Sequence, residues 1–269
     1  TTLTGNYTTL AWPSAPNRAG FVAITATRDG TEVQLLGKGD FAAGAGIDAA
    51  GNGKVSLNRG DVLEVIAKHD GPSGQYGADI SGTRLKANQP VQVIAGHSCA
   101  NIPTATTDAC DHIEHSMLPI ETLGKEYHVT FPAALASQSP HVVRIVAIEP
   151  NTKLSFDPPS VSADKTLSPS DPPLELSAVT SDFKVSSDKA FMVAQYMQGQ
   201  GSVPSGSGDP SLALSVPAAQ YRKSYTFIAS ASYDTNFVNV IAKTGSTVTL
   251  DGTAIPAASF TISSASARF

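Results

Sequence analysis

The residues most able to do chemistry lie in one stretch, from position 91 to position 127, which holds both cysteines and three of the six histidines. Cys99 and Cys110 bracket ten residues that include Thr, Asp and Pro, and a polar segment with two of the histidines follows. This pattern has three chemical interpretations: a loop closed by a disulfide, a metal site, or a catalytic elbow. The choice among them largely decides the function.

The spacing of the cysteines favours a disulfide. A loop of about a dozen residues closes easily, and closing it would stabilise the fold by roughly 3 kcal/mol. An even number of cysteines also suits an oxidising compartment. We therefore predict a bond between Cys99 and Cys110, with two free buried thiols as the alternative.

A metal site is the second interpretation, because zinc favours tetrahedral sets of Cys and His ligands. The two cysteines with His97, His112 and His115 could supply such a set, but the chain lacks the usual C-x2-C and H-x3-H pairs. Calcium is a separate possibility because acidic loops could donate oxygens, although no D-x-D-x-D-G loop is present. The acidic residues concerned are Asp108, Asp111 and Glu114, or Asp157, Asp164 and Asp171. We expect no metal or other cofactor, with calcium the exception to test.

Catalysis is the third interpretation, since GHSCA at 96–100 superficially resembles the nucleophile elbow G-x-S-x-G. That motif requires a helix directly after the serine, and Asn101-Ile102-Pro103 cannot begin one. No alternation of strands and helices exists to build a hydrolase sheet. We therefore expect no catalytic residue and no enzymatic activity.

Aromatic and histidine side chains are the candidate ligand contacts. Tyr76 and Tyr233 lie among turn residues and are predicted to meet a ligand at the surface. His112 and His115 are read as polar loop residues that could join them. Trp12, the single tryptophan, lies in an apolar strand and is expected in the core.

Composition narrows the class of protein. Charged residues make up only 15% of the 269 residues, hydrophobic residues 41%, and Ser, Thr, Gly and Pro are abundant, as in extracellular β-proteins. The net charge is −5 and the 18 basic residues do not cluster, so a nucleic-acid partner is not expected. No apolar run is long enough to predict a membrane span.

Alternating runs of Val, Ile, Thr and aromatic residues between Gly, Pro, Asn and Asp turns predict an all-β fold. The expected strands are 7–12, 21–27, 32–36, 55–58, 62–68, 84–86, 91–95, 127–131, 142–148, 153–156, 174–179, 183–185, 191–196, 225–230, 237–242, 247–250 and 260–262.

Internal repetition predicts how these strands are grouped. An Asp, a Pro eight residues later and a Tyr eight further on occur twice: Asp111, Pro119 and Tyr127, then Asp209, Pro217 and Tyr225. A strand-turn-strand block also recurs, beginning at Phe21, Val142 and Phe237. We predict tandem β-sandwich units, two of them complete: 1–117 with the cysteine loop, 118–208, and 209–269 as the start of a third, incomplete unit. The intact chain would continue, or a partner would supply the missing strands.

The cysteine segment, read as a whole, resembles the IgGFc-binding protein N-terminal domain family. The resemblance rests on GHSCANIP at 96–103, CDH at 110–112, Pro119 and LGxxY at 123–127. It extends upstream to ISGT at 80–83 and downstream to DPS at 209–211 and LDGT at 250–253, so it covers nearly the whole chain. It implies a secreted or cell-surface, non-enzymatic binding module.

These lines together predict an exported adhesion, binding or structural module of a cell surface, matrix or filament. Its partner would be a protein or glycan ligand, or further copies of the chain assembled through the open third unit into a homo-oligomer or filament. The alternative is a lectin-like carbohydrate-binding protein or a metal-dependent secreted enzyme centred on residues 96–127.

Overall fold

A computed structural model of the chain describes residues 3–133, 139–203, 206, 208–260, 262–264 and 267–268. Within these residues the fold is all-β, as predicted, and each helix is a three-residue 3-10 turn. None of the described helices has the length and apolar character that crossing a membrane requires. Residue 261, in the last expected strand, lies outside the described residues.

The first eight strands form two antiparallel four-stranded sheets. One has the order β1 (Asn6–Thr8), β6 (Arg84–Ala87), β3 (Thr31–Leu36) and β4 (Gly53–Leu57). The other has the order β5 (Val62–Ile66), β2 (Gly20–Ala26), β7 (Val91–Ala100) and β8 (Asp111–Ser116).

These two sheets share one buried apolar cluster. In β3 every second residue is buried, so Val33 and Leu35 point inward. They belong to the same buried cluster as Ile24 and Val93 of the other sheet. This packing is compatible with the predicted β-sandwich.

The next seven strands are centred on one long strand, β14 (Phe183–Met197). The first part of β14 pairs with β9 and β11, and its last part pairs with β10 and β15. The neighbours are β9 (Gly124–Val129), β10 (His141–Ala147), β11 (Thr152–Asp157), β12 (Lys165–Leu167), β13 (Leu174–Val179) and β15 (Ser211–Leu214). Tyr127, Val143, Phe183 and Val193 lie in a second buried cluster between these strands.

We call β1 to β8 the first part of the molecule and β9 to β15 the second part. The order of paired strands in the second part follows that in the first part. Strands β9, β14, β11 and β12 repeat the order β1, β6, β3 and β4, while β13, β10, β14 and β15 repeat β5, β2, β7 and β8. The single strand β14 therefore occupies the positions that two separate strands, β6 and β7, occupy in the first part. The expected strands 183–185 and 191–196 are thus one strand, with a shift of register between Ser186 and Phe191 in its pairing with β9.

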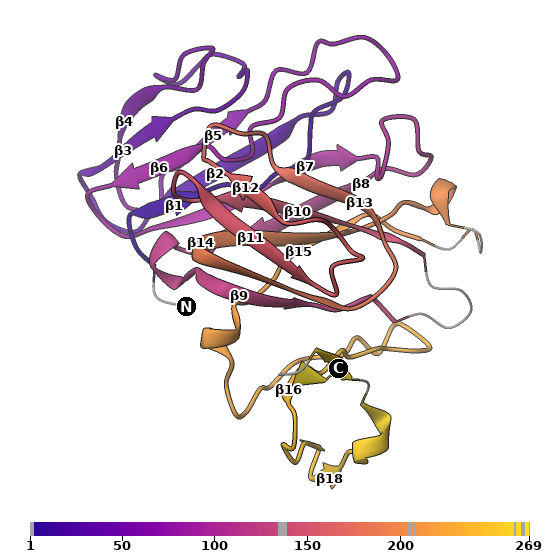
Figure 1. The fold of residues 1–269 in the computed structure, drawn as a ribbon. Coiled ribbons are helices and arrows are strands. Elements are labelled where there is room, and N and C mark those ends of the chain that lie inside the picture. Colours follow the sequence, from indigo (N-terminus) through magenta and orange to yellow (C-terminus); the bar gives the residue numbers. More distant parts are fainter. Residues whose placement is uncertain are drawn as a thin grey trace.

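The outer face of the second part packs directly on the first. Val142 and Val146 of β10, Tyr196 of β14 and Leu214 of β15 belong to the buried cluster of the first eight strands. Figure 1 shows the two parts stacked against each other, with the segment after β15, orange to yellow, projecting from them.

Several sequence predictions were wrong in detail. The segment 111–116, read as a polar loop, is strand β8, and β12 and β15 were not predicted. The segments 225–230 and 237–242 were expected as strands, but strand structure there is limited to β16 (Ala242–Lys243). The remaining strands are β17 (Thr249–Leu250), β18 (Thr253–Ala254), β19 (Ile262–Ser264) and β20 (Ala267–Arg268), which form two small sheets, β16-β20-β19 and β17-β18.

Candidate functional site

The cysteine segment connects two neighbouring strands of one sheet. Cys99 lies near the end of β7, Cys110 lies just before β8, and the two form a disulfide with a Cα–Cα distance of 5.1 Å. The loop between them is fixed by the buried Asn101, whose Nδ2 donates to the Thr107 carbonyl at 2.5 Å. The predicted bond is therefore present, and it removes both thiols from metal binding and nucleophilic chemistry.

The three histidines of this segment point to different environments. His97 is 1% exposed, and its Nδ1 accepts from the Cys99 backbone N–H at 3.1 Å. Burial, helped by the positive charge of Arg18, lowers the pKa of His97 to about 4, so it is neutral at pH 7. His112 is about half exposed, stacks on Phe21 with ring centroids 5.7 Å apart, and has Nε2 3.3 Å from Glu114.

His115 lies on β8 as well, and its Nδ1 is 2.8 Å from the Ser116 carbonyl oxygen. In the part of the chain that the structure describes, no group of three or more His, Cys, Asp or Glu side chains is placed to hold a metal ion. Among the described residues, the candidate zinc ligands are therefore not brought together.

Ser98 does not occupy a nucleophile elbow. Residues 96–100 lie inside β7, which pairs with β2 on one side and β8 on the other. The Ser98 hydroxyl accepts from the Ala19 backbone N–H at 3.0 Å. The sharp turn into a helix that exposes the serine in hydrolases is not formed here.

Tyr76 and Trp12 are neighbours. Trp12 is 1% exposed, as predicted for a core residue, and its Nε1 donates to the Tyr76 hydroxyl at 3.0 Å. The Tyr76 hydroxyl in turn donates to the Asn101 carbonyl at 2.5 Å. The Tyr76 side chain is therefore half-buried and its hydroxyl already has two hydrogen-bond partners, whereas Tyr233 is 70% exposed. Ligand binding by either tyrosine stays a prediction.

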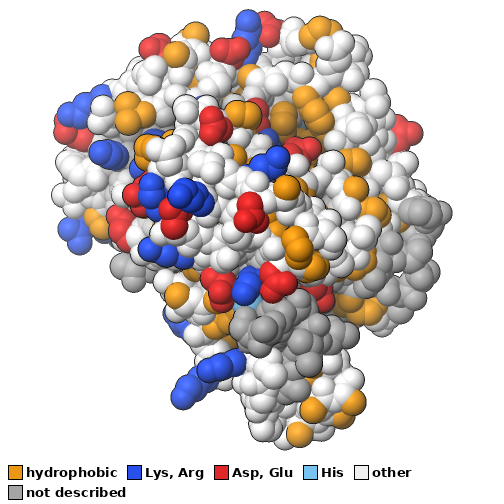
Figure 2. Space-filling view, in the orientation of Figure 1, with side chains coloured by type: hydrophobic (Ala, Val, Ile, Leu, Met, Phe, Trp, Pro, Cys, Tyr) orange, Lys and Arg blue, Asp and Glu red, His pale blue; other side chains and the backbone are white. Residues whose placement is uncertain are grey.

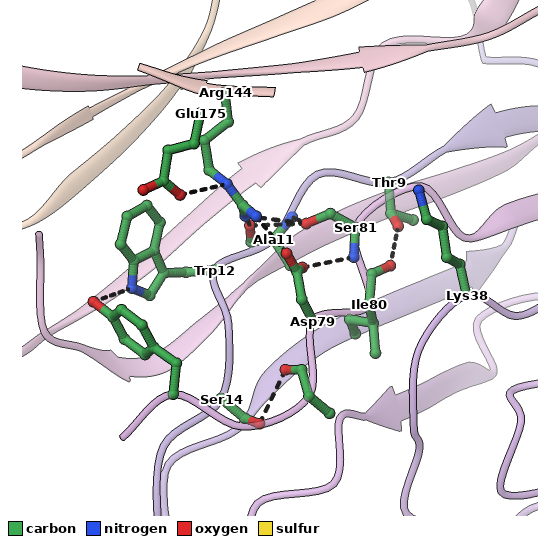
Figure 3. Close-up of polar contacts among 12 residues, drawn as sticks. Thr9, Ala11, Trp12, Ser14, Lys38, Asp79, Ile80, Ser81, Arg144 and Glu175 are labelled. Atoms are coloured by element: carbon green, nitrogen blue, oxygen red, sulfur yellow. Dashed lines mark hydrogen bonds and ion pairs between the residues drawn. The ribbon is translucent and has the colours of Figure 1, made fainter. Parts of the chain in front are cut away.

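A buried arginine joins the two parts of the molecule, and the sequence reasoning missed it. Arg144 of β10 is 3% exposed and forms an ion pair with Asp79, which precedes β6. Its Nη1 donates to the Ala11 carbonyl at 2.6 Å, and its Nε lies 3.3 Å from Glu175. Figure 3 shows Asp79, Ser81 and the Ala11 backbone converging on the guanidinium group from the first part.

Aromatic rings complete this junction. The Arg144 guanidinium carbon lies 5.4 Å from the centroid of the Trp12 ring, a cation–π distance. Tyr196 packs on Trp12 with centroids 4.9 Å apart, and its hydroxyl donates to the Ala11 carbonyl at 3.1 Å. We call Ala11, Trp12, Asp79, Arg144 and Tyr196 the junction network.

The electrostatics of the junction network favour the charged pair. Burial alone would raise the pKa of Asp79, but the charge of Arg144 and the Ser81 hydrogen bonds outweigh it, so the pKa lies below its ordinary value. Burial likewise opposes the charged form of Arg144, and Asp79 overcomes it, so the Arg144 pKa is raised. The pair is therefore ionised at pH 7 and holds the two parts together.

One sequence signal could have revealed this junction. Arg144 is the only charged residue in the strand HVVRIVA, whose seven residues are all buried. A charge inside such a strand requires a buried partner. The sequence does not show which residue is that partner, because Asp79 lies 65 residues away in the chain.

Fold and site together define an all-β protein of antiparallel sheets, braced by one disulfide between β7 and β8 and by a buried ion pair between its two parts. The chain belongs to the IgGFc-binding protein family: the family model described as IgGFc binding protein matches residues 1–267.

A curated relative supports this membership. The human IgGFc-binding protein is 32% identical over 136 residues, which cover 48% of this chain and 2% of the relative. The chain thus corresponds to a small part of the relative's length. No solved structure matches.

Proposed function

We propose that this chain is a non-enzymatic extracellular module that binds a protein or glycan, or contributes structure, at a cell surface, matrix or filament. The observation that carries the proposal is the junction network, which fixes two β-sheet parts into one body through the buried Arg144–Asp79 pair. A body of this kind presents fixed loops and sheet faces to a partner. Membership of the IgGFc-binding protein family supports a binding role.

The exposed face of β8 is the surface that we assign to ligand contact. Strand alternation buries Ile113 and leaves His112 and Glu114 exposed, with Phe21 beneath the His112 ring. On the face of the molecule that Figure 2 shows, acidic and basic side chains are intermingled, so that face carries no row of cationic side chains of the kind that binds phosphates.

The relative's name states that it binds the Fc part of IgG, and the matched 136 residues cover 2% of that protein. We therefore include Fc as one ligand among several. We also propose the predicted units 1–117, 118–208 and 209–269 as the organisation of the module. The pairing of β15 with β14 brings residues 211–214 to the second unit.

Binding measurements on an immobilised chain test the function. The analytes are Fc, a glycan panel, and purified extracellular matrix proteins, each measured with and without EDTA and in parallel with hydrolase assays. We expect saturable binding of at least one analyte, insensitive to EDTA, and no turnover. A double variant, His112→Ala with Glu114→Ala, should weaken binding at least tenfold.

The matched control is Lys54→Ala with Glu32→Ala, which removes an exposed ion pair from the opposite sheet and should leave binding unchanged. Turnover of any substrate, or binding that EDTA abolishes, would instead support the metal-dependent enzyme or lectin. Calcium restoring EDTA-treated binding would identify the acidic loops as the site.

A further inference from the structure

The loop that the disulfide closes, residues 100–109, is tied to the first part of the molecule through its backbone. The Asn101 carbonyl accepts from the Trp12 Nε1–H at 3.0 Å and from the Tyr76 hydroxyl at 2.5 Å. We call this loop the disulfide loop. Because Trp12 belongs to the junction network, the disulfide loop supports one side of that network.

The disulfide loop is also tied to the second part. The Gly199 N–H donates to the Ile102 carbonyl at 2.8 Å, and the Gly201 N–H donates to the Asp108 carbonyl at 3.2 Å. Both glycines lie in the segment that follows β14. The disulfide loop therefore connects the two parts through main-chain hydrogen bonds.

Glycine at positions 199 and 201 allows the two backbones to approach this closely. A Cβ at Gly201 would lie 2.7 Å from the Asp108 backbone nitrogen, and a Cβ at Gly199 would lie 2.8 Å from the Ala109 carbonyl oxygen. A side chain does not fit at either distance, so the contact depends on the missing Cβ atoms. The backbones of the two segments are thus fitted to each other, and a displacement of the disulfide loop would break the fit.

Two features at the Cys110 end of the disulfide loop oppose this docking. Ala109 has a φ of 60°, in the left-handed region that is unfavourable for a residue with a Cβ. The carboxyl group of Asp111 lies beside that of Asp209, and burial together with this neighbour raises the pKa of Asp209. Two such groups repel each other when both are ionised. The covalent bond at Cys110 holds the loop in place against both effects.

We propose that the bond between Cys99 and Cys110 is a redox-sensitive latch between the two parts of the molecule. While the bond is intact, it keeps the disulfide loop docked on Gly199 and Gly201. When the bond is reduced, the backbone at Ala109 relaxes and the loop leaves these glycines. The contact with the second part then opens, and Trp12 loses the support of the loop.

The reaction requires a dithiol reductant, which can reach the bond because Cys99 and Cys110 are both partly exposed. One thiolate of the dithiol attacks a sulfur of the bond and displaces one cysteine, and its second thiolate then displaces the other cysteine. The protein gains two electrons and two protons as two thiols, and the dithiol becomes a cyclic disulfide. The Arg144–Asp79 pair lies outside the disulfide loop, so reduction loosens one edge of the junction and leaves the two parts attached. The inference does not depend on the proposed function.

Native-state hydrogen exchange on the full 269-residue chain tests the latch, with dithiothreitol as the dithiol. Reduction should speed the exchange of the amides at 199–203 at least tenfold and increase the quenching of Trp12 emission by acrylamide. Exchange at 199–203 should then become independent of low urea concentrations, which marks a local opening, whereas exchange in β11 should keep the urea dependence of global unfolding. Reoxidation should restore the slow rate.

Variants separate the latch from a general loss of stability. Cys99→Ser with Cys110→Ser should show the fast exchange at 199–203 without reductant. Gly201→Ala should show it with the disulfide intact, because the added Cβ displaces the loop, whereas Gly44→Ala, whose Cβ would meet nothing within 4 Å, should not. Unchanged exchange at 199–203 after both thiols are alkylated, acceleration no greater than in β11, or a silent Gly201→Ala variant would overturn the proposal.

Discussion

The junction network gives a test of how the two parts of the molecule are held together. We predict that Arg144→Ala lowers the free energy of unfolding by about 3 to 4 kcal/mol. Removing one partner of a buried ion pair costs roughly 3 to 5 kcal/mol, because the other charge stays buried without compensation. The Asp79 side chain is 24% exposed, so water relieves part of that cost and the lower end applies. The lost cation–π contact with Trp12 adds about 1 kcal/mol.

The single tryptophan makes the assay specific, because Trp12 lies in the junction network itself. Urea unfolding is followed by Trp12 emission and, in parallel, by far-UV circular dichroism. In the wild type the two transitions should coincide. In Arg144→Ala the Trp12 emission should shift to the red, and its midpoint should fall below that of the circular dichroism signal.

Two further variants separate the ion pair from general damage. Arg144→Met with Asp79→Asn removes both charges and keeps the acceptor for the Ser81 N–H, so it should recover most of the lost stability. Arg59→Ala, in an exposed loop, should change stability by less than about 0.5 kcal/mol. The reasoning fails if Arg144→Ala costs less than about 1 kcal/mol, or if the double variant is as unstable as the single one.

Three other predictions concern stability. Replacing both cysteines by serine should cost about 3 kcal/mol, and wild type in reductant should show the same urea midpoint; unequal midpoints would contradict this. The pKa values of His97 and His141 lie at about 4, below the ordinary 6.5, because both are buried. Between pH 4 and pH 6.5 the unfolded chain therefore binds more protons than the folded chain. The free energy of unfolding is highest above pH 6.5 and falls by up to about 3 kcal/mol per histidine as the pH drops to 4. Urea titrations at pH 7 and 4.5 should show this loss, reduced by about half in His141→Gln. Tyr127→Phe should cost about 1 to 3 kcal/mol, since it leaves the Phe191 carbonyl without its donor, whereas Tyr225→Phe should be neutral.

The all-β fold class could be predicted from the sequence because the alternation of buried and exposed residues in a strand appears within a few consecutive residues. Strand β3 alternates buried and exposed residues without interruption, and the aligned block in β11 does the same. Strand β8 was missed because DHIEHS has one fully buried apolar residue, Ile113, and the strand is recognisable only through its pairing with β7. Residues 237–242 show the reverse case: the pattern is that of a strand, but a strand also needs paired neighbours.

Site residues were harder to predict, since their roles depend on distant parts of the chain. The disulfide followed from two cysteines within one loop. Tyr76 lies in a turn, as the sequence indicates, but its hydroxyl is used by Trp12 and Asn101, which lie 64 and 25 residues away. Contacts of that separation cannot be read from local composition.

The unbroken course of β14 has a mechanical consequence. Because this one strand pairs with β9 and β11 along its first part and with β10 and β15 along its last part, a pulling force along it loads the hydrogen bonds to all four neighbours at once, and they must fail together. In the first part, the three residues between β6 and β7 provide slack, so its sheets can separate in sequence. Single-molecule stretching of the chain should therefore show a stiffer, one-step rupture for the second part, the behaviour expected of a load-bearing link.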